Sequence, residues 1–324
     1  MSKKKPHTVH HIIPQCYLRN FTNMVRGIYT YDKNRSSKYI KPIDKACAID
    51  NYYRIADFNA KNEDEALSIE VGYLANAVET TFSDILQEII KIKNAWVSNS
   101  SVKLSCELKV QMAYMLSIQY LRMPHARDTA LSIFKTISEF EERMVKKNVA
   151  EQENNPAILG LRIDKQFDDA FIHAQSTFQN ERLLLDFCIA LSRNYWTFLV
   201  SQENSFYTSD FPIVVQPHIK GVMPTHCGLT QYGAELSFPI SKDIMLVIWD
   251  KEYFSAKISE DCSFRYISEP ELRKYNLLRY GYAKEEVYEY NNDFGWIDFI
   301  KTMNGGKHHY FGSNGIIIKH YGTR

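Results

Sequence analysis

The middle of the chain carries the spacing of amphipathic helices. From about residue 63 to 193, apolar residues recur mostly at intervals of three and four, with charged residues between them. The pattern predicts four helices that pack together. The first ends at the Asn- and Ser-rich break at 94–101, and the others cover about 101–124 with Ser101 as cap, 126–149, and 164–194 with Asp164 as cap.

Strand patterns dominate both ends of the chain. Segments rich in β-branched and aromatic residues, bounded by turn residues, predict strands at 27–32, 46–55, 195–200, 205–208, 213–216 and 237–249, and near the end at 315–322. Pro14 opens a short helical stretch, and Ser268, Pro270 and Glu271 predict a capped helix that runs to about Ala283.

Strands at both ends and helices in the middle predict an α+β fold. The simplest arrangement is one mixed or antiparallel sheet, built from the N- and C-terminal segments, with a helical lobe inserted between them. We expect a flexible tail at 1–6 and a single domain at 7–324. Within that domain the helical lobe covers about 63–193, and the sheet segments cover about 7–55 and 195–324.

The composition of the chain limits which binding partners and which cellular compartment we expect. Lys plus Arg number 39 and Asp plus Glu 38, so the net charge is 39 − 38 = +1, and bulk charge does not hold this protein to nucleic acid, although a local basic patch could. No stretch approaches the roughly 20 apolar residues of a membrane span, and the basic N-terminus lacks the apolar run of a secretory signal. The six cysteines show no CxxC spacing. We therefore expect a cytoplasmic protein without a membrane partner.

Three separated segments carry candidate chemistry. His10 and His11 are able to exchange protons near neutral pH or bind a metal, and as neighbours in an extended segment they face opposite ways. The alternative is a structural histidine bonded to main chain. Gln119 and Arg122 share a helix face, and Arg122 is suited to clamp a phosphate, as is Arg127; the alternative is an ion pair between lobe and sheet.

Asp210 lies where a strand runs into Ser209 and is stopped by Pro212. It is a candidate base, metal ligand or partner of a histidine, and the alternative is a turn cap that bonds nearby amides. We expect the helical glutamates, Glu70 among them, to be solvated. The chain has no Walker loop, GxGxxG, HExxH, GxSxG or zinc-deaminase signature, and His308 and His309 are a weak metal signal.

These segments, in this order, resemble a known family. The opening HHxxPQxYLRxF at 10–21, QxxRxPxxR at 119–127, TSDxP at 208–212 and FPIS at 238–241 resemble the bacterial family called domain of unknown function 4238, over roughly residues 7–290. Met123 departs from the family pattern, which often has Thr there. The family has no settled activity, and its members occur among bacterial anti-phage defence genes.

The resemblance implies that the His, Arg and Asp motifs meet in space. On that basis we expect an enzyme, a nuclease-like phosphodiester hydrolase acting in anti-phage defence, with nucleic acid as partner and a divalent metal as a candidate cofactor. The rivals are a toxin acting on protein or nucleotide, and a non-catalytic sensor or binding module in which the same residues form a structural polar network. The expected catalytic residues are His10, His11, Arg122 and Asp210, and the expected substrate-binding residues are Arg19, Gln119, Arg127 and Ser209.

Overall fold

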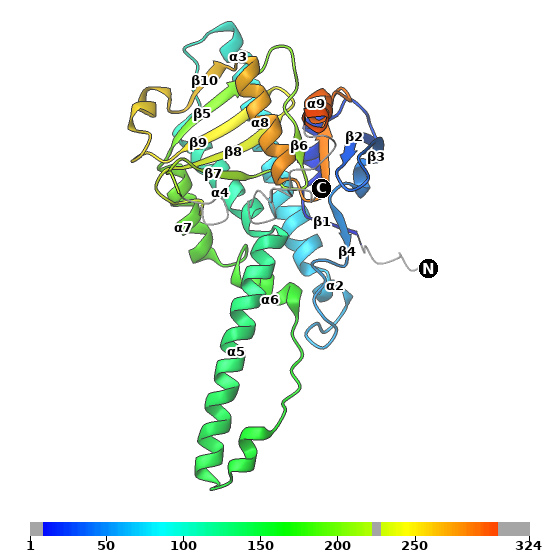
Figure 1. The fold of residues 1–324 in the computed structure, drawn as a ribbon, viewed down its shortest axis with the longest axis vertical. Coiled ribbons are helices and arrows are strands. Elements are labelled where there is room, and N and C mark those ends of the chain that lie inside the picture. The colour runs from blue at the N-terminus through cyan, green and yellow to red at the C-terminus, as the bar shows by residue number, and fades with distance from the viewer. Residues whose placement is uncertain (1–8, 222–227, 304–324) are drawn as a thin grey trace, which may run out of the picture.

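The computed structural model describes residues 9–221 and 228–303, which form a body of sheets and helices with one long projecting arm (Figure 1). The α+β class and the helical lobe in the middle of the chain are confirmed. The lobe consists of α2 (Glu63–Ala66), a π-helical segment (Ser68–Val78), α3 (Glu79–Ser98), α4 (Cys106–Leu121), α5 (Pro124–Gln152), α6 (Asp169–Ser176) and α7 (Glu181–Ser192).

Two helix boundaries differ from the sequence prediction. Ser105, and not Ser101, caps α4, because its Oγ accepts a hydrogen bond from the amide of Leu108 at 3.2 Å. The single helix predicted over 164–194 was wrong. Asp168 caps α6 and Asn180 caps α7, each accepting a bond from the amide three residues later, so that the segment forms two helices.

The larger sheet lies entirely in the second half of the chain. Its five strands have the order β10 (Ser263–Tyr266), β5 (Tyr195–Val200), β9 (Ile244–Trp249), β8 (Ala234–Ser241) and β7 (Val214–Pro217). The sheet is mixed, because β10 pairs with β5 in parallel and the other pairs are antiparallel. The strand predicted over 237–249 is in fact the β8–β9 hairpin, which turns at Lys242 and Asp243.

The two ends of the chain meet in a separate antiparallel sheet of four strands. Its order is β3 (Ser37–Pro42), β2 (Gly27–Asp32), β11 (Glu286–Glu289) and β6 (Thr208–Ser209), so it joins N- and C-terminal segments as predicted. A third pair, β1 (Val9–His11) with β4 (Ala48–Asp50), lies beside it. The predicted single sheet is therefore three. The strand predicted over 46–55 is limited to β4, because Asn51 adopts a φ of 55° and turns the chain.

Three further helices and several 3₁₀ turns complete the described structure. They are α1 (Gln15–Leu18), α8 (Glu269–Tyr282) and α9 (Gly295–Met303), with 3₁₀ turns at Arg19–Phe21, Ile43–Lys45, Pro156–Gly160 and Ser255–Glu260. The predicted capping box of Ser268 and Glu271 opens α8. The tail at 1–6, the strand predicted at 315–322, and His308 and His309 lie outside the described residues.

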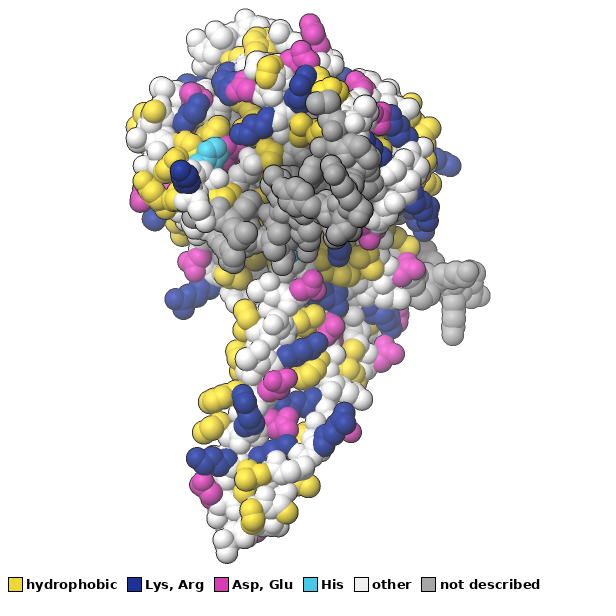
Figure 2. Space-filling view, viewed as in Figure 1, with side chains coloured by type: hydrophobic (Ala, Val, Ile, Leu, Met, Phe, Trp, Pro, Cys, Tyr) yellow, Lys and Arg dark blue, Asp and Glu magenta, His cyan; other side chains and the backbone are white. Residues whose placement is uncertain are grey.

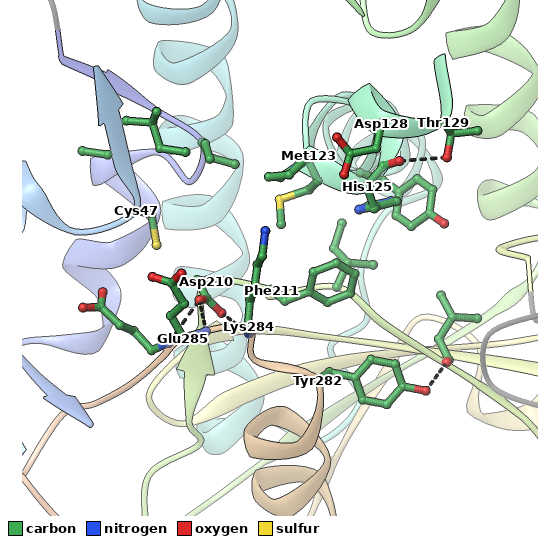
Figure 3. A pocket seen from close by; sticks show the side chains of 18 of the residues that line it. Cys47, Met123, His125, Asp128, Thr129, Asp210, Phe211, Tyr282, Lys284 and Glu285 are labelled. Carbon is green, nitrogen blue, oxygen red and sulfur yellow. Dashed lines mark hydrogen bonds between the residues drawn. The ribbon is translucent and has the colours of Figure 1, made fainter. Parts of the chain in front are cut away.

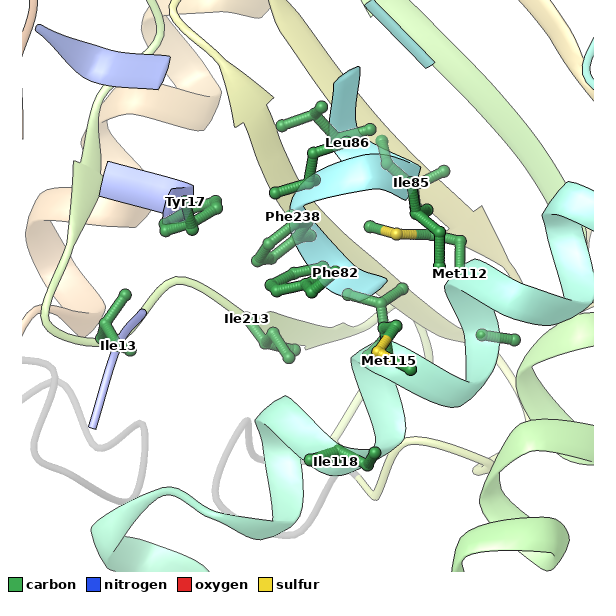
Figure 4. Close-up of a cluster of buried hydrophobic side chains, with 14 of the residues drawn as sticks. Ile13, Tyr17, Phe82, Ile85, Leu86, Met112, Met115, Ile118, Ile213 and Phe238 are labelled. Atoms are coloured by element: carbon green, nitrogen blue, oxygen red, sulfur yellow. The ribbon is translucent and has the colours of Figure 1, made fainter. Parts of the chain in front are cut away.

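The core forms where α3 and α4 cover one face of the larger sheet. Phe82 of α3 and Met112 of α4 pack there with Phe238 of β8, and the ring of Tyr17 lies 5.0 Å from that of Phe238 (Figure 4). Strands β8 and β9 are buried at every position, because α8 packs on the other face through Leu272 and Tyr275. None of the helices in residues 9–221 and 228–303 combines the length and apolar character that a membrane span requires.

Candidate functional site

A cavity of about 540 Å³ lies between the start of α5, β4 and the connection from α8 to β11. Its walls come from segments far apart in sequence, chiefly residues 47–49, 120–129, 210–215 and 282–286 (Figure 3). The volume is typical of a pocket for a small organic molecule. Apolar side chains such as Ile12, Met123 and Ile213 line it together with two lysines and four carboxylates: Lys41, Lys284, Asp128, Asp210, Glu285 and Glu286.

Asp210 lies at the floor of this cavity and clamps the main chain beside it. Its Oδ1 accepts a hydrogen bond from the amide of Lys284 at 2.8 Å, and its Oδ2 accepts from the amides of Glu285 at 2.6 Å and Glu286 at 3.1 Å. Burial raises the pKa of the Asp210 carboxyl to about 6, although the three amides favour the charged form. The carboxyl therefore fixes the start of β11 and the position of Lys284.

Lys284 carries a positive charge into the cavity. Figure 3 shows its side chain extending from the α8–β11 connection into the space between Asp210 and Met123. Within the part of the chain that the structure describes, its ammonium has no carboxylate partner, whereas the ammonium of Lys41 pairs with Glu286 at 2.7 Å. Lys284 is therefore available to bind an anionic group of a ligand.

His125 lines the cavity, and both of its ring nitrogens are buried and unpaired. Its ring packs 4.6 Å from that of Tyr120 and 5.3 Å from that of Phe211, and neither nitrogen has a hydrogen-bond partner among the described residues. Burial lowers the pKa of His125 to about 4, a shift that the nearby Asp128 opposes, so the ring is neutral at pH 7. Buried polar groups are normally hydrogen-bonded. The unpaired ring nitrogens therefore make His125 a candidate for hydrogen bonding to a ligand.

The two histidines singled out from the sequence lie behind the wall of the cavity. His10 is fully buried, and its Nδ1 accepts a hydrogen bond from the amide of Tyr53 at 2.8 Å. The Nε2 of His11 lies 3.1 Å from the carbonyl oxygen of Asp44 and 3.2 Å from the side-chain amide of Gln15. Both rings thus hold neighbouring segments of the fold together.

Gln119 and Arg122, at the end of α4, donate hydrogen bonds to neighbouring main-chain oxygens of the N-terminal segment. Arg122 is fully buried; its Nη2 donates to the carbonyl oxygen of His11, and the guanidinium lies 3.3 Å from Oε1 of Glu79. Gln119 donates through Nε2 to the carbonyl oxygen of Ile12 at 3.2 Å. Since Ile12 lines the cavity, this network supports the wall from behind.

Glu70 belongs to the same buried network, which corrects the expectation of a solvated side chain. It is 4% exposed, and its Oε1 accepts a hydrogen bond from the amide of His11 at 3.3 Å. Burial raises the pKa of Glu70 to about 7. The π-helical segment Ser68–Val78 breaks the regular helical register that the sequence pattern assumed, and Glu70 therefore points inward.

The other predicted substrate-binding residues do not line the cavity. Arg19 is exposed and donates to Gln15 Oε1 at 3.4 Å, and Arg127 donates to the carbonyl oxygen of Tyr52 at 2.6 Å. Ser209 is buried, and its Oγ accepts from the amide of Phe211 at 3.1 Å. Of the residues singled out from the sequence, Asp210 is the one that lines the cavity.

His125 and Lys284 were not among the site residues predicted from the sequence. Each stands next to a residue that drew attention, His125 inside the segment 119–127 and Lys284 directly after Ala283 at the end of α8. The only signal in the sequence was a histidine in the first turn of a helix that begins with Pro124. Among residues 9–221 and 228–303, no three His, Cys, Asp or Glu side chains are arranged to hold a metal ion.

Comparison with known proteins supports the family resemblance. The family model described as protein of unknown function (DUF4238) matches residues 9–293. No curated protein and no solved structure matches the chain. The match includes β1, α4, the start of α5 and the α8–β11 connection, which together build the cavity. The chain therefore belongs to the DUF4238 family.

Proposed function

We propose that this protein is a phosphodiester hydrolase whose active site is the cavity around His125, Lys284 and Asp210. The observation that carries the proposal is that His125 lines the cavity while both of its buried ring nitrogens lack a hydrogen-bond partner among the described residues. A neutral imidazole in that position is able to accept a proton from an attacking water molecule. Lys284 supplies the positive charge that a phosphate oxygen requires.

In the proposed reaction, a water oxygen forms a bond to phosphorus and the bond to the leaving ester oxygen breaks. The proton of the water passes to His125 and then to the leaving oxygen. In the free protein the pKa of His125, about 4, makes the ring a weak base. A phosphate bound beside it favours the protonated ring, so substrate binding raises that pKa toward neutrality.

The size and the walls of the cavity favour a single-stranded substrate. A volume of about 540 Å³ is large enough for one nucleotide. The rings of Tyr120, Phe211 and Tyr282 line it and offer stacking surfaces for an unpaired base. The near-neutral net charge of the chain agrees with a site that recognises one nucleotide and not a long polyanion.

The remaining predicted residues act indirectly in this proposal. Asp210 holds Lys284 in place through the amide of that residue. Arg122 and Gln119 hold the wall that includes Ile12. Direct roles for His10, His11, Arg122, Arg19, Arg127 and Ser209 stay predictions, as does a divalent metal.

The proposed setting is the bacterial cytoplasm, with the protein acting as an effector of anti-phage defence on nucleic acid. This part of the proposal rests on the family resemblance. Phage plaque counts on cells that carry the wild-type gene or the His125→Gln gene test it directly.

A second candidate function is ligand sensing without catalysis. It is favoured by the finding that His10, Arg122 and Gln119 are all bonded to main-chain atoms and therefore serve the fold. In that case the cavity binds a nucleotide-sized ligand and leaves it intact.

Cleavage assays separate the two functions. The wild type is incubated with short labelled single-stranded DNA, single-stranded RNA and duplex DNA, in the presence of Mg²⁺, Mn²⁺ or EDTA. Lys284→Met is compared with Lys103→Met, an exposed lysine that precedes α4 and does not line the cavity. We expect cleavage of single strands, a loss of at least about tenfold in kcat/KM for Lys284→Met, and no change for Lys103→Met. Nucleotide binding without cleavage under every condition establishes the sensor instead.

A further inference from the structure

The projecting arm exposes a continuous apolar stripe along α5. Ile133, Ile137, Phe140 and Met144 recur at intervals of four, three and four residues, and their side chains are between 45% and 57% exposed. This alternation is the spacing of the two apolar positions of a coiled-coil seam. The stripe therefore has the pattern of a helix that packs against a second helix.

The rest of the arm leaves this stripe uncovered. The return segment 161–167 packs on another side of α5, where Lys165 donates to the carbonyl oxygen of Ser138 at 2.7 Å and the ring of Phe167 lies 5.8 Å from that of Phe134. With 3.6 residues per turn, that side lies about 110° around the helix from the stripe. The arm is two layers thick, and within it the stripe has no cover.

We propose that the stripe is a dimer interface, in which α5 packs antiparallel against α5 of a second copy of this chain. A two-fold axis between residues 138 and 139 places Ile133 of one copy opposite Met144 of the second copy, and Ile137 opposite Phe140. Each layer of the seam is then filled by two large apolar side chains, and the same surface serves both copies. This self-complementarity identifies the second copy as the occupant.

The shape of the molecule requires the antiparallel direction. The wide body sits at one end of the arm (Figure 1), so parallel arms bring two bodies into the same space, and antiparallel arms place them at opposite ends. In the antiparallel register the flanking position Glu141 faces Phe134, and Arg143 faces Thr136. No like charges therefore oppose each other beside the seam.

The charges on the arm argue against a membrane as the occupant. Figure 2 shows Lys and Arg side chains next to Asp and Glu side chains along the arm, with hydrophobic ones between them. A helix that lies on a lipid surface carries a polar face rich in Lys and Arg. The polar sides of α5 are mixed: Lys135, Arg143, Lys146 and Lys147 are interspersed with Glu139, Glu141 and Glu142.

The length of the stripe sets the expected strength of the dimer. The part of α5 beyond residue 131 is about 32 Å long, from a rise of about 1.5 Å per residue. Pairing over that length gives an interface at the low end for specific complexes, below about 1,200 Å² in total. We expect a dissociation constant in the micromolar range and not an obligate dimer.

Sedimentation velocity of the full chain between about 1 and 100 µM tests the proposal. We expect a monomer–dimer equilibrium, which the double substitution Ile137→Glu, Phe140→Glu weakens at least tenfold. Glu139→Lys, a charge change on an exposed residue of the same helical turn outside the stripe, leaves the equilibrium unchanged. Circular dichroism confirms that each variant is folded. The proposal is overturned by a wild type that stays monomeric to 100 µM, by a dimer that the double substitution leaves intact, or by a monomer that binds lipid vesicles.

Cross-linking tests the direction of the helices. Ile137→Cys and Phe140→Cys chains are prepared separately and treated with a short bismaleimide, with the wild type as the background for its exposed Cys106. Antiparallel pairing gives a dimer band above background when the two variants are mixed and little when each is alone. The proposed register is refuted if each variant alone cross-links strongly and the mixture gives no stronger dimer band than the separate variants do.

Discussion

Arg122 donates a hydrogen bond through Nη2 to the main-chain carbonyl oxygen of His11, which joins the end of α4 to strand β1. The two residues are 111 positions apart in sequence. The bond shows that two motifs of the chain do meet, but through the backbone of His11 and not through its imidazole. This bond holds His11 in place directly before Ile12, which lines the cavity.

Arg122→Met is expected to destabilise the fold by about 3–5 kcal/mol, because it removes one partner of a buried charged network. The carbonyl oxygen of His11 and the carboxylate of Glu79 lose a donor. Urea unfolding followed by circular dichroism measures the effect, with Arg127→Met as a control at a less buried arginine. A variant as stable as the wild type but inactive in cleavage argues for a direct catalytic role of Arg122.

Glu70→Gln is expected to flatten the dependence of stability on pH. The pKa of Glu70 is raised from 4.5 to about 7, so the folded state binds the proton more tightly than the unfolded state does. Its contribution to stability is therefore full below about pH 4.5 and is lost as the pH rises to 7, by roughly 3 kcal/mol.

Unfolding free energies at pH 5 and pH 8 measure this dependence. Relative to the wild type, the unfolding free energy of Glu70→Gln should be higher at pH 8 than at pH 5. Glu65→Gln is the matched control, because Glu65 is less buried and lies five residues earlier, in α2. Parallel pH profiles for the wild type and Glu70→Gln contradict the assignment of a buried, proton-binding Glu70.

Asp210→Asn is expected to cost about 1–3 kcal/mol, because an amide has one acceptor oxygen where the carboxylate has two, so at least one of the three main-chain amides loses its partner. The same substitution frees the segment that carries Lys284, and cleavage should fall with it. Asp128→Asn, an exposed carboxylate on the cavity rim, serves as the control for stability. Thermal denaturation that leaves Asp210→Asn unchanged shows that the clamp is unimportant.

The sequence predicted the parts of the fold that depend on local patterns. Strand 195–200 and the helix capped by Ser268 follow from periodicity and capping chemistry, and both are present. The division of the expected sheet into three depends on pairing between distant segments, such as β11 with β2, which no local pattern encodes. The inward turn of Glu70 depends on a π-helical register, which the ordinary helical period does not predict.

The candidate site was predicted less well than the fold, for a physical reason. Residue type marked Arg122 and His10 as chemical groups, but their bonds to main-chain atoms are tertiary and were invisible in the sequence. Asp210, a predicted catalytic residue, lines the cavity, but its partners, the amides of residues 284–286, lie about 75 positions away. The significance of His125 lies in having no partner, which only the packing of the chain reveals.

The most direct test of the account is the single-turnover rate of single-strand cleavage by His125→Gln, measured together with its thermal stability. Glutamine is close in size, and His125 makes no hydrogen bond among the described residues that the fold could lose. We predict a rate at least about 100-fold below that of the wild type, with an unchanged melting temperature. A variant that cleaves at the wild-type rate would contradict the claim that this cavity is the active site.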